Sequence, residues 1–85
     1  MKVTLKNKVG LHARPAALFV QTAKKFKSNI KVIKGDLEAN AKSILEVLSL
    51  GAEYNDEIFI EAVGEDEEEA LKTLVDLVNN KFGEE

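Results

Sequence analysis

Apolar and polar residues alternate in four short stretches of the chain, and each stretch is predicted to be a half-buried β-strand. The stretches cover residues 2–6, 30–34, 37–40 and 57–63. Only Gly35 and Asp36 separate the second stretch from the third, which favours a tight hairpin between them. In the last stretch, Ile58, Ile60 and Ala62 are expected to share one face.

Other stretches have the spacing of amphipathic helices. The first helix is predicted over residues 13–26, with the apolar face Ala16, Phe19, Val20, Ala23 and Phe26. Leu18 falls off this face, so we expect either an incidentally exposed apolar residue or a docking residue. Lysines in or just beyond the last turn suit the helix dipole.

A second, short helix is predicted over residues 43–51. Ser43 is a plausible N-cap and Gly51 a plausible C-terminal stop. Val47 and Leu50 are expected to face the core. Three further apolar residues of this helix then point elsewhere, namely Ile44, Leu45 and Leu48. Together with Leu18 they could form an exposed patch.

The acidic run at 65–69 is predicted to begin the last helix, where negative charge complements the dipole. An apolar stripe continues from Ala70 to Phe82. Carboxylates at successive helical positions point around the helix, so we do not interpret the run as a metal site. The order β-α-β-β-α-β-α predicts a single α+β domain over residues 1–85, with one antiparallel sheet covered by helices on one face.

The only histidine, the only arginine and the only proline of the chain lie together in Gly10-Leu11-His12-Ala13-Arg14-Pro15, between the first strand and the first helix. Proline is tolerated in the first turn of a helix, which places His12 at or just before the helix start. Free backbone N–H groups and the positive end of the dipole favour an anion there. Arg14 adds a planar fork of donors suited to phosphate.

Charge is strongly segregated along the chain. Residues 1–34 contain nine Lys or Arg and no acid, whereas residues 35–85 contain fifteen Asp or Glu and three Lys, for a net charge of −3. We expect most of these charges to interleave in space and neutralise each other, and those near His12 to form a basic surface for acidic partners. Nucleic-acid binding is disfavoured by the negative net charge.

Composition excludes several other kinds of site. The chain has no Cys and a single His, which excludes disulfides and thiol nucleophiles and argues against a structural zinc site. No cofactor or metal is expected. The N-terminal segment has no apolar core of a signal peptide, and no apolar run could span a membrane, so we expect a cytoplasmic protein.

The chemistry that fits His12 is phosphoryl transfer. A neutral imidazole is nucleophilic near pH 7 because its unperturbed pKa is about 6.5. Attack on phosphorus gives a labile P–N bond, so the group can be passed on, with Arg14 and backbone N–H groups stabilising its charge. The chain has no P-loop, so another phosphoprotein is the expected donor.

The stretch Gly10-Leu11-His12-Ala13-Arg14-Pro15-Ala16 resembles the active-site signature of HPr, the histidine phosphocarrier family of the phosphoenolpyruvate-dependent sugar phosphotransferase system. Lys42-Ser43-Ile44-Leu45, followed by Leu48-Ser49-Leu50-Gly51, resembles the second signature of that family, around its regulatory serine. The resemblance covers essentially the whole chain, and two signatures at the expected separation are highly specific.

The resemblance implies an open-faced β-sandwich and a monomeric, stoichiometric carrier that is not an enzyme. It implies that Nδ1 of His12 accepts phosphate from enzyme I, that Arg14 coordinates it, and that IIA domains of sugar permeases receive it. Ser43 maps onto the serine modified by an ATP-dependent HPr kinase/phosphorylase, whose phosphorylated form can act with a regulator in carbon catabolite repression. The patch Leu18, Ile44, Leu45 and Leu48 agrees with the surface used for enzyme I and IIA.

Three positions depart from the family pattern. Val9 stands where Asn, Ser or Thr often bonds near the histidine, so backbone groups must position the imidazole here. Glu46 replaces a frequent Gly or Lys and adds negative charge near Ser43. Asn55 stands in a turn that commonly carries Gly and can adopt a left-handed conformation. Two alternatives remain open: a nitrogen-branch or regulatory paralogue, and a small anion-binding module without phosphoryl transfer.

Overall fold

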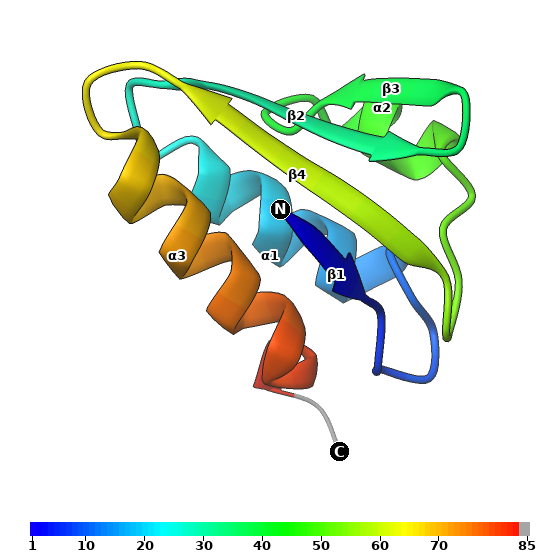
Figure 1. Cartoon of the computed structure of the whole chain (residues 1–85). Helices are drawn as coiled ribbons and strands as arrows, with labels where there is room; N and C mark the ends of the chain where they lie inside the picture. Colours follow the sequence, from blue (N-terminus) through cyan, green and yellow to red (C-terminus); the bar gives the residue numbers. More distant parts are fainter. Residues whose placement is uncertain (84–85) are drawn as a thin grey trace.

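The computed structural model describes residues 1–83 and contains one four-stranded antiparallel sheet with helices packed on one face (Figure 1). The strands are β1 (Lys2–Thr4), β2 (Asn29–Lys34), β3 (Leu37–Asn40) and β4 (Glu57–Val63). The helices are α1 (Ala13–Ala23), α2 (Ile44–Ser49) and α3 (Glu67–Asn79), followed by the short 3₁₀ turn η1 (Lys81–Gly83). The predicted α+β class and element order are confirmed.

The sheet has the order β1-β4-β2-β3, so the longest strand is central and pairs with both β1 and β2. Its alternation is as predicted, because Ile58, Ile60 and Ala62 are buried under the helices. Phe59 and Val63 lie on the opposite, uncovered face and are exposed. One sheet face therefore builds the core and the other faces solvent.

The helices complete the core with their apolar stripes. Val47 and Leu50 of the second helical segment are buried, as the spacing predicted. The largest buried side chains come from strands, helices and the loop before α1, which shows that all layers share one core: Phe19, Leu5, Leu11, Ile58, Ile60 and Leu74. Among the described residues, no helix is long and apolar enough to cross a membrane.

The first strand is shorter than predicted. β1 ends at Thr4, yet Leu5 is fully buried and its backbone continues to pair. Its N–H donates to the carbonyl of Asp56 at 2.9 Å, and its carbonyl accepts from the N–H of Asn55 at 2.8 Å. The chain therefore leaves the sheet to pair with the loop before β4. Asn55 has a φ of 72°, so the expected left-handed turn is confirmed.

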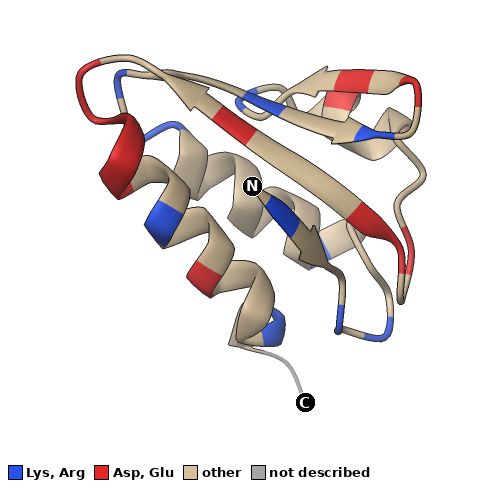
Figure 2. Ribbon diagram, in the orientation of Figure 1, with Lys and Arg blue, Asp and Glu red and all other residues tan. Residues whose placement is uncertain are grey.

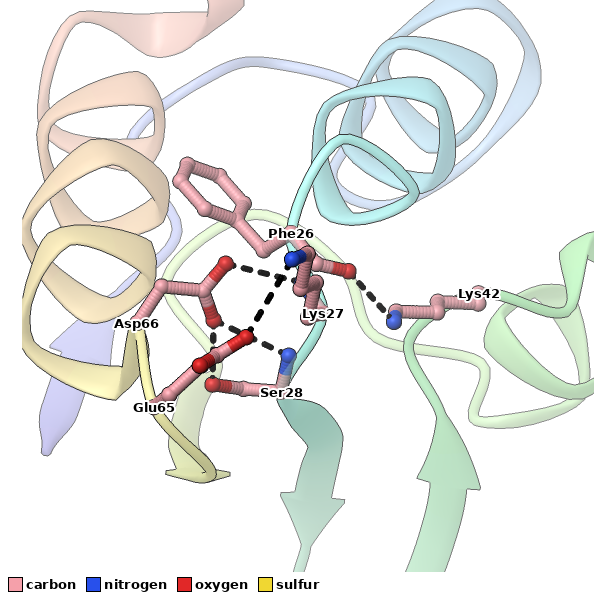
Figure 3. A network of polar contacts seen from close by, with 6 residues as sticks. All are labelled: Phe26, Lys27, Ser28, Lys42, Glu65 and Asp66. Atoms are coloured by element: carbon pink, nitrogen blue, oxygen red, sulfur yellow. Dashed lines mark hydrogen bonds and ion pairs between the residues drawn. The ribbon is translucent and has the colours of Figure 1, made fainter.

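The prediction that α1 extends to Phe26 is wrong, since the helix ends at Ala23. The backbone tightens there, because the Lys25 N–H bonds the Thr22 carbonyl and the Phe26 N–H bonds the Ala23 carbonyl, three residues back instead of four. Phe26 still packs partly buried against the core. Its carbonyl accepts a hydrogen bond from Lys42 Nζ at 2.7 Å (Figure 3).

The last helix begins at Glu67 and not at the start of the acidic run, because Asp66 is used as a connector (Figure 3). Its carboxylate accepts the backbone N–H groups of Lys27 at 2.8 Å and Ser28 at 2.9 Å, and also the Ser28 hydroxyl. The hydroxyl bond from Ser28 lowers the pKa of Asp66, so this acceptor stays charged at neutral pH. The network ties the turn before β2 to the start of α3.

The last helix also ends before Phe82, although the sequence predicted a helical apolar stripe up to that residue. The α3 helix ends at Asn79, and Lys81 and Phe82 have left-handed φ values of 57° and 56°. These two residues cannot continue a right-handed helix. They turn the Phe82 ring back into the core, where it is buried.

The two differently charged halves of the chain do interleave in part. Four ion pairs between described residues each join a lysine of residues 1–34 to an acid of the later segment. These ion pairs are Lys2–Glu57 (3.9 Å), Lys27–Glu65 (3.3 Å), Lys31–Glu38 (3.5 Å) and Lys34–Asp56 (3.3 Å). The expected neutralisation is confirmed for these lysines. Figure 2 shows acidic residues gathered in the first turn of α3.

Candidate functional site

His12 is the N-cap of α1, at the end of the loop that follows β1, as the sequence predicted. Its backbone is extended, with φ −129° and ψ 159°, and its side chain makes no capping hydrogen bond. The residue is half-buried and lines an open depression together with Lys8, Val9, Glu53 and Tyr54. The imidazole is thus accessible at a helix start and is not committed to capping.

Gly10 and Leu11 anchor the loop that carries His12. The Leu11 N–H donates to the Ala52 carbonyl at 2.9 Å, and the Leu11 side chain is fully buried. Gly10 has a φ of 64° and lies directly against the neighbouring loop, so that a Cβ would stand 2.5 Å from the Ala52 carbonyl oxygen and 2.5 Å from the Glu53 Cα. Only glycine fits this contact. The close approach of Gly10 to the neighbouring loop therefore holds the backbone before His12 in place.

The first residue of α1 has an unusual backbone. Ala13 has a φ of 49°, in the left-handed region that costs a residue with a Cβ roughly 1–3 kcal/mol. Right-handed helix follows at Arg14, and such an alternation turns successive backbone N–H groups toward one point. Arg14 is exposed two residues after His12, and the buried Pro15 completes the first turn. This arrangement suits an anion held beside the imidazole.

Ser43 is the N-cap of α2, as predicted, and its hydroxyl accepts the N–H of Glu46 at 3.3 Å. The Glu46 carboxylate in turn accepts the backbone N–H of Asn40 at 2.8 Å. Sequence reasoning treated Glu46 only as an added charge. The Ser-x-x-Glu spacing is the signal of a capping box and could have predicted that this carboxylate reaches back toward the chain before the helix.

The predicted docking patch is formed mainly by α2. Leu45 is 78% exposed, and Ile44 and Leu48 are 39% and 37% exposed. Leu18 is not one of the fully buried residues of α1, but it is half-buried and packs in part against the core, so its role in docking stays a prediction. The patch therefore has one strongly exposed residue and three that are partly covered.

Within residues 1–83, no three His, Cys, Asp or Glu side chains group closely enough to hold a metal ion. At the start of α3, the Asp66 carboxylate is bonded to Lys27 and Ser28, and the Glu67 carboxylate accepts the Gly64 N–H at 3.0 Å.

Comparison with known proteins assigns the chain to a family. A family model described as the PTS HPr component phosphorylation site matches residues 1–80. The chain belongs to the HPr family. It is 47% identical over 78 residues to the phosphocarrier protein HPr of Neisseria meningitidis, covering 92% of this chain and 88% of the relative.

Two further members of the HPr family extend this comparison. The HPr-like protein Crh of Bacillus subtilis is 45% identical over 80 residues, with 94% of each chain covered. The solved structure of HPr-C-His from Thermoanaerobacter tengcongensis is 56% identical and superposes with a TM-score of 0.98, covering 100% of this chain and 96% of the other. The open-faced sandwich is therefore the HPr fold.

Asn7 is a residue of this HPr-family site that the sequence analysis missed. It is fully buried, its side-chain Nδ2 donates to the Gly10 carbonyl at 2.9 Å, and its backbone carbonyl accepts the Gly10 N–H at 3.2 Å. The Val9 side chain is 47% exposed and offers no hydrogen bond to His12, as expected. Instead, the two hydrogen bonds between Asn7 and Gly10 stabilise the turn of this loop. An Asn followed three residues later by Gly in a loop is a turn signal that could have indicated this role.

Proposed function

We propose that this chain is a cytoplasmic phosphocarrier of the phosphoenolpyruvate-dependent sugar phosphotransferase system. Nδ1 of His12 accepts a phosphoryl group from phosphorylated enzyme I and passes it to IIA domains of sugar permeases. The observation that carries the proposal is the accessible imidazole at the start of α1, next to Arg14, in a chain of the HPr family.

The chemistry needs little beyond this geometry. The lone pair of the neutral imidazole attacks phosphorus, a P–N bond forms, and the bond between phosphorus and the donor breaks with its electron pair leaving on the donor. Arg14 and the first N–H groups of α1 stabilise the phosphoryl oxygens. The reverse attack by an acceptor protein regenerates His12, so the chain acts stoichiometrically and is not itself an enzyme.

A transfer assay tests this proposal. Incubation of the chain with phosphoenolpyruvate and a bacterial enzyme I is expected to add one acid-labile, base-stable phosphoryl group, because phosphoramidates hydrolyse in acid. The label should be absent from His12→Ala and present in Ser43→Ala, which serves as the matched control. A wild-type chain that stays unlabelled, or a label that survives His12→Ala, would leave only the anion-binding alternative.

Ser43 is proposed as a regulatory site for an ATP-dependent kinase. Its hydroxyl is half-buried at the N-cap of α2, directly before the exposed Ile44 and Leu45. A phosphate there adds negative charge to the docking patch and hinders approach of an acidic partner. With ATP and an HPr kinase, we expect an acid-stable phosphate that Ser43→Ala lacks, and a lower rate of labelling at His12. An unmodified Ser43, or an unchanged His12 rate after modification, would refute this regulation.

A second candidate function is a regulatory role, which the similarity to Crh, the catabolite repression HPr of Bacillus subtilis, favours; a nitrogen-branch role also stays open. The presence of His12 argues against paralogues that lack the active histidine. Parallel transfer assays with enzyme I proteins of the sugar and nitrogen systems separate these possibilities, since only the cognate donor is expected to label the chain efficiently.

A further inference from the structure

A second depression adjoins the one that contains His12. It is lined by Lys6, Lys8, Tyr54 and Lys81, and it shares Lys8 and Tyr54 with the His12 depression. Three separate segments meet there: the loop after β1, the loop before β4 and the turn after α3. We call Lys6, Lys8, Lys81 and Tyr54 the basic surface. It is continuous with the surface around the imidazole.

Three lysines of this surface have no acidic partner in the described part of the chain. Lys6, Lys8 and Lys81 are exposed and form no ion pair within residues 1–83, whereas Lys2, Lys27, Lys31 and Lys34 each pair with an acidic side chain. Figure 2 shows basic residues in the loop after β1 and at the end of α3, at the same end of the molecule. No ion pair with a described acid therefore neutralises their charge, although Glu53 also lines the His12 depression.

We infer that the basic surface is a contact site for the acidic surface that surrounds the phosphoryl group of a partner protein. The inference rests on the proposed function and deepens it by naming a second half of the recognition surface. The patch on α2 is apolar and suits an apolar counterpart, whereas the basic surface supplies charge complementarity on residues that the patch does not contain. A partner that carries a phosphoryl group and flanking carboxylates matches both the imidazole and the lysines.

Tyr54 gives this surface a central anchor. It is 54% exposed and lies between the two depressions. A tyrosine combines a flat apolar ring with a hydroxyl, and such residues are enriched at binding hot spots. The lysines around it act mainly at longer range, by raising the rate at which an acidic partner arrives in the right orientation.

The test compares two charge-matched double variants. Lys8→Glu/Lys81→Glu reverses two lysines of the basic surface. Lys31→Glu/Lys72→Glu reverses two lysines on the uncovered sheet face and on α3, away from the basic surface. Both chains are first checked for folding by circular dichroism, and kcat/KM for labelling by phosphoenolpyruvate and enzyme I is then measured at low and high salt.

We expect kcat/KM of Lys8→Glu/Lys81→Glu to fall about tenfold or more at low salt, mainly through a higher KM, and to approach the wild type at high salt. The control should stay within about twofold of the wild type, because mutated charges away from the contact contribute little to steering. Equal kcat/KM for the two folded variants would overturn the basic surface while leaving the phosphocarrier function intact. A wild-type chain that no enzyme I labels would overturn both.

Discussion

Replacing Gly10 with alanine is expected to lower the free energy of unfolding by roughly 3 kcal/mol, through overpacking and an unfavourable φ. The added Cβ would stand 2.5 Å from the Ala52 carbonyl oxygen and 2.5 Å from the Glu53 Cα, and neither is a flexible side-chain atom. The loop that carries His12 must then move away from its neighbour, so labelling at His12 should fall as well. Urea denaturation followed by circular dichroism measures the loss.

Gly35→Ala is the matched control for this substitution. Gly35 also has a left-handed φ, 60°, but a Cβ there would meet no atom within 4 Å. It should therefore show only the conformational part of the cost, about 1 kcal/mol. If the two alanine variants lose the same stability, the close contact between Gly10 and the Ala52–Glu53 backbone does not constrain the loop as described.

Arg14→Glu is expected to reduce the rate of phosphoryl transfer to His12 by about a hundredfold or more, since it replaces a cation beside the phosphoryl oxygens with an anion. Arg14 is exposed, and its replacement fills no part of the core, so the thermal unfolding midpoint should change little. Transfer from enzyme I is measured on the folded variant under single-turnover conditions, which separates the chemical step from partner turnover.

Arg14→Lys provides the graded comparison. Lysine keeps the positive charge but lacks the planar fork that bonds two phosphoryl oxygens at once, so an intermediate rate is expected. A rate for Arg14→Glu equal to that of the wild type would remove Arg14 from the mechanism. A loss of the same size in Arg14→Lys and Arg14→Glu would show that bidentate geometry matters more than charge.

Local patterns were sufficient to predict most of the fold. The alternation in β4 placed Ile58 and Ile60 in the core, and the spacing of Val47 and Leu50 oriented α2 correctly. The position of His12 at a helix start followed from Pro15 in the first turn. These predictions succeeded because each depends on the residue types of one short segment.

Features that depend on distant segments could not be predicted in this way. The early end of α1 reflects the use of Asp66, nearly forty residues later, to bond the backbone of Lys27 and Ser28. The requirement for Gly10 arises from the Ala52–Glu53 backbone across the loop. The periodicity of one segment contains no information about which distant segment it contacts. Such contacts can therefore be identified only from the three-dimensional structure.

Helix ends were the least accurate predictions for a related reason. The stripe from Ala70 to Phe82 has helical spacing throughout, yet Lys81 and Phe82 adopt left-handed conformations and the phenyl ring is buried from a turn. Burial of one large aromatic side chain outweighs the cost of the unfavourable backbone. Periodicity indicates which side chains are buried, but it does not indicate the backbone conformation through which they are buried.

The central claim is that the phosphoryl group resides on one ring nitrogen of His12. The most direct measurement is nuclear magnetic resonance of the chain after labelling by phosphoenolpyruvate and enzyme I, with ¹⁵N in the imidazole and ³¹P detection. We predict a single phosphoramidate, with ³¹P–¹⁵N coupling to Nδ1 of His12. A phosphorus signal coupled to no imidazole nitrogen, or no phosphorus bound to the folded chain, would contradict the account.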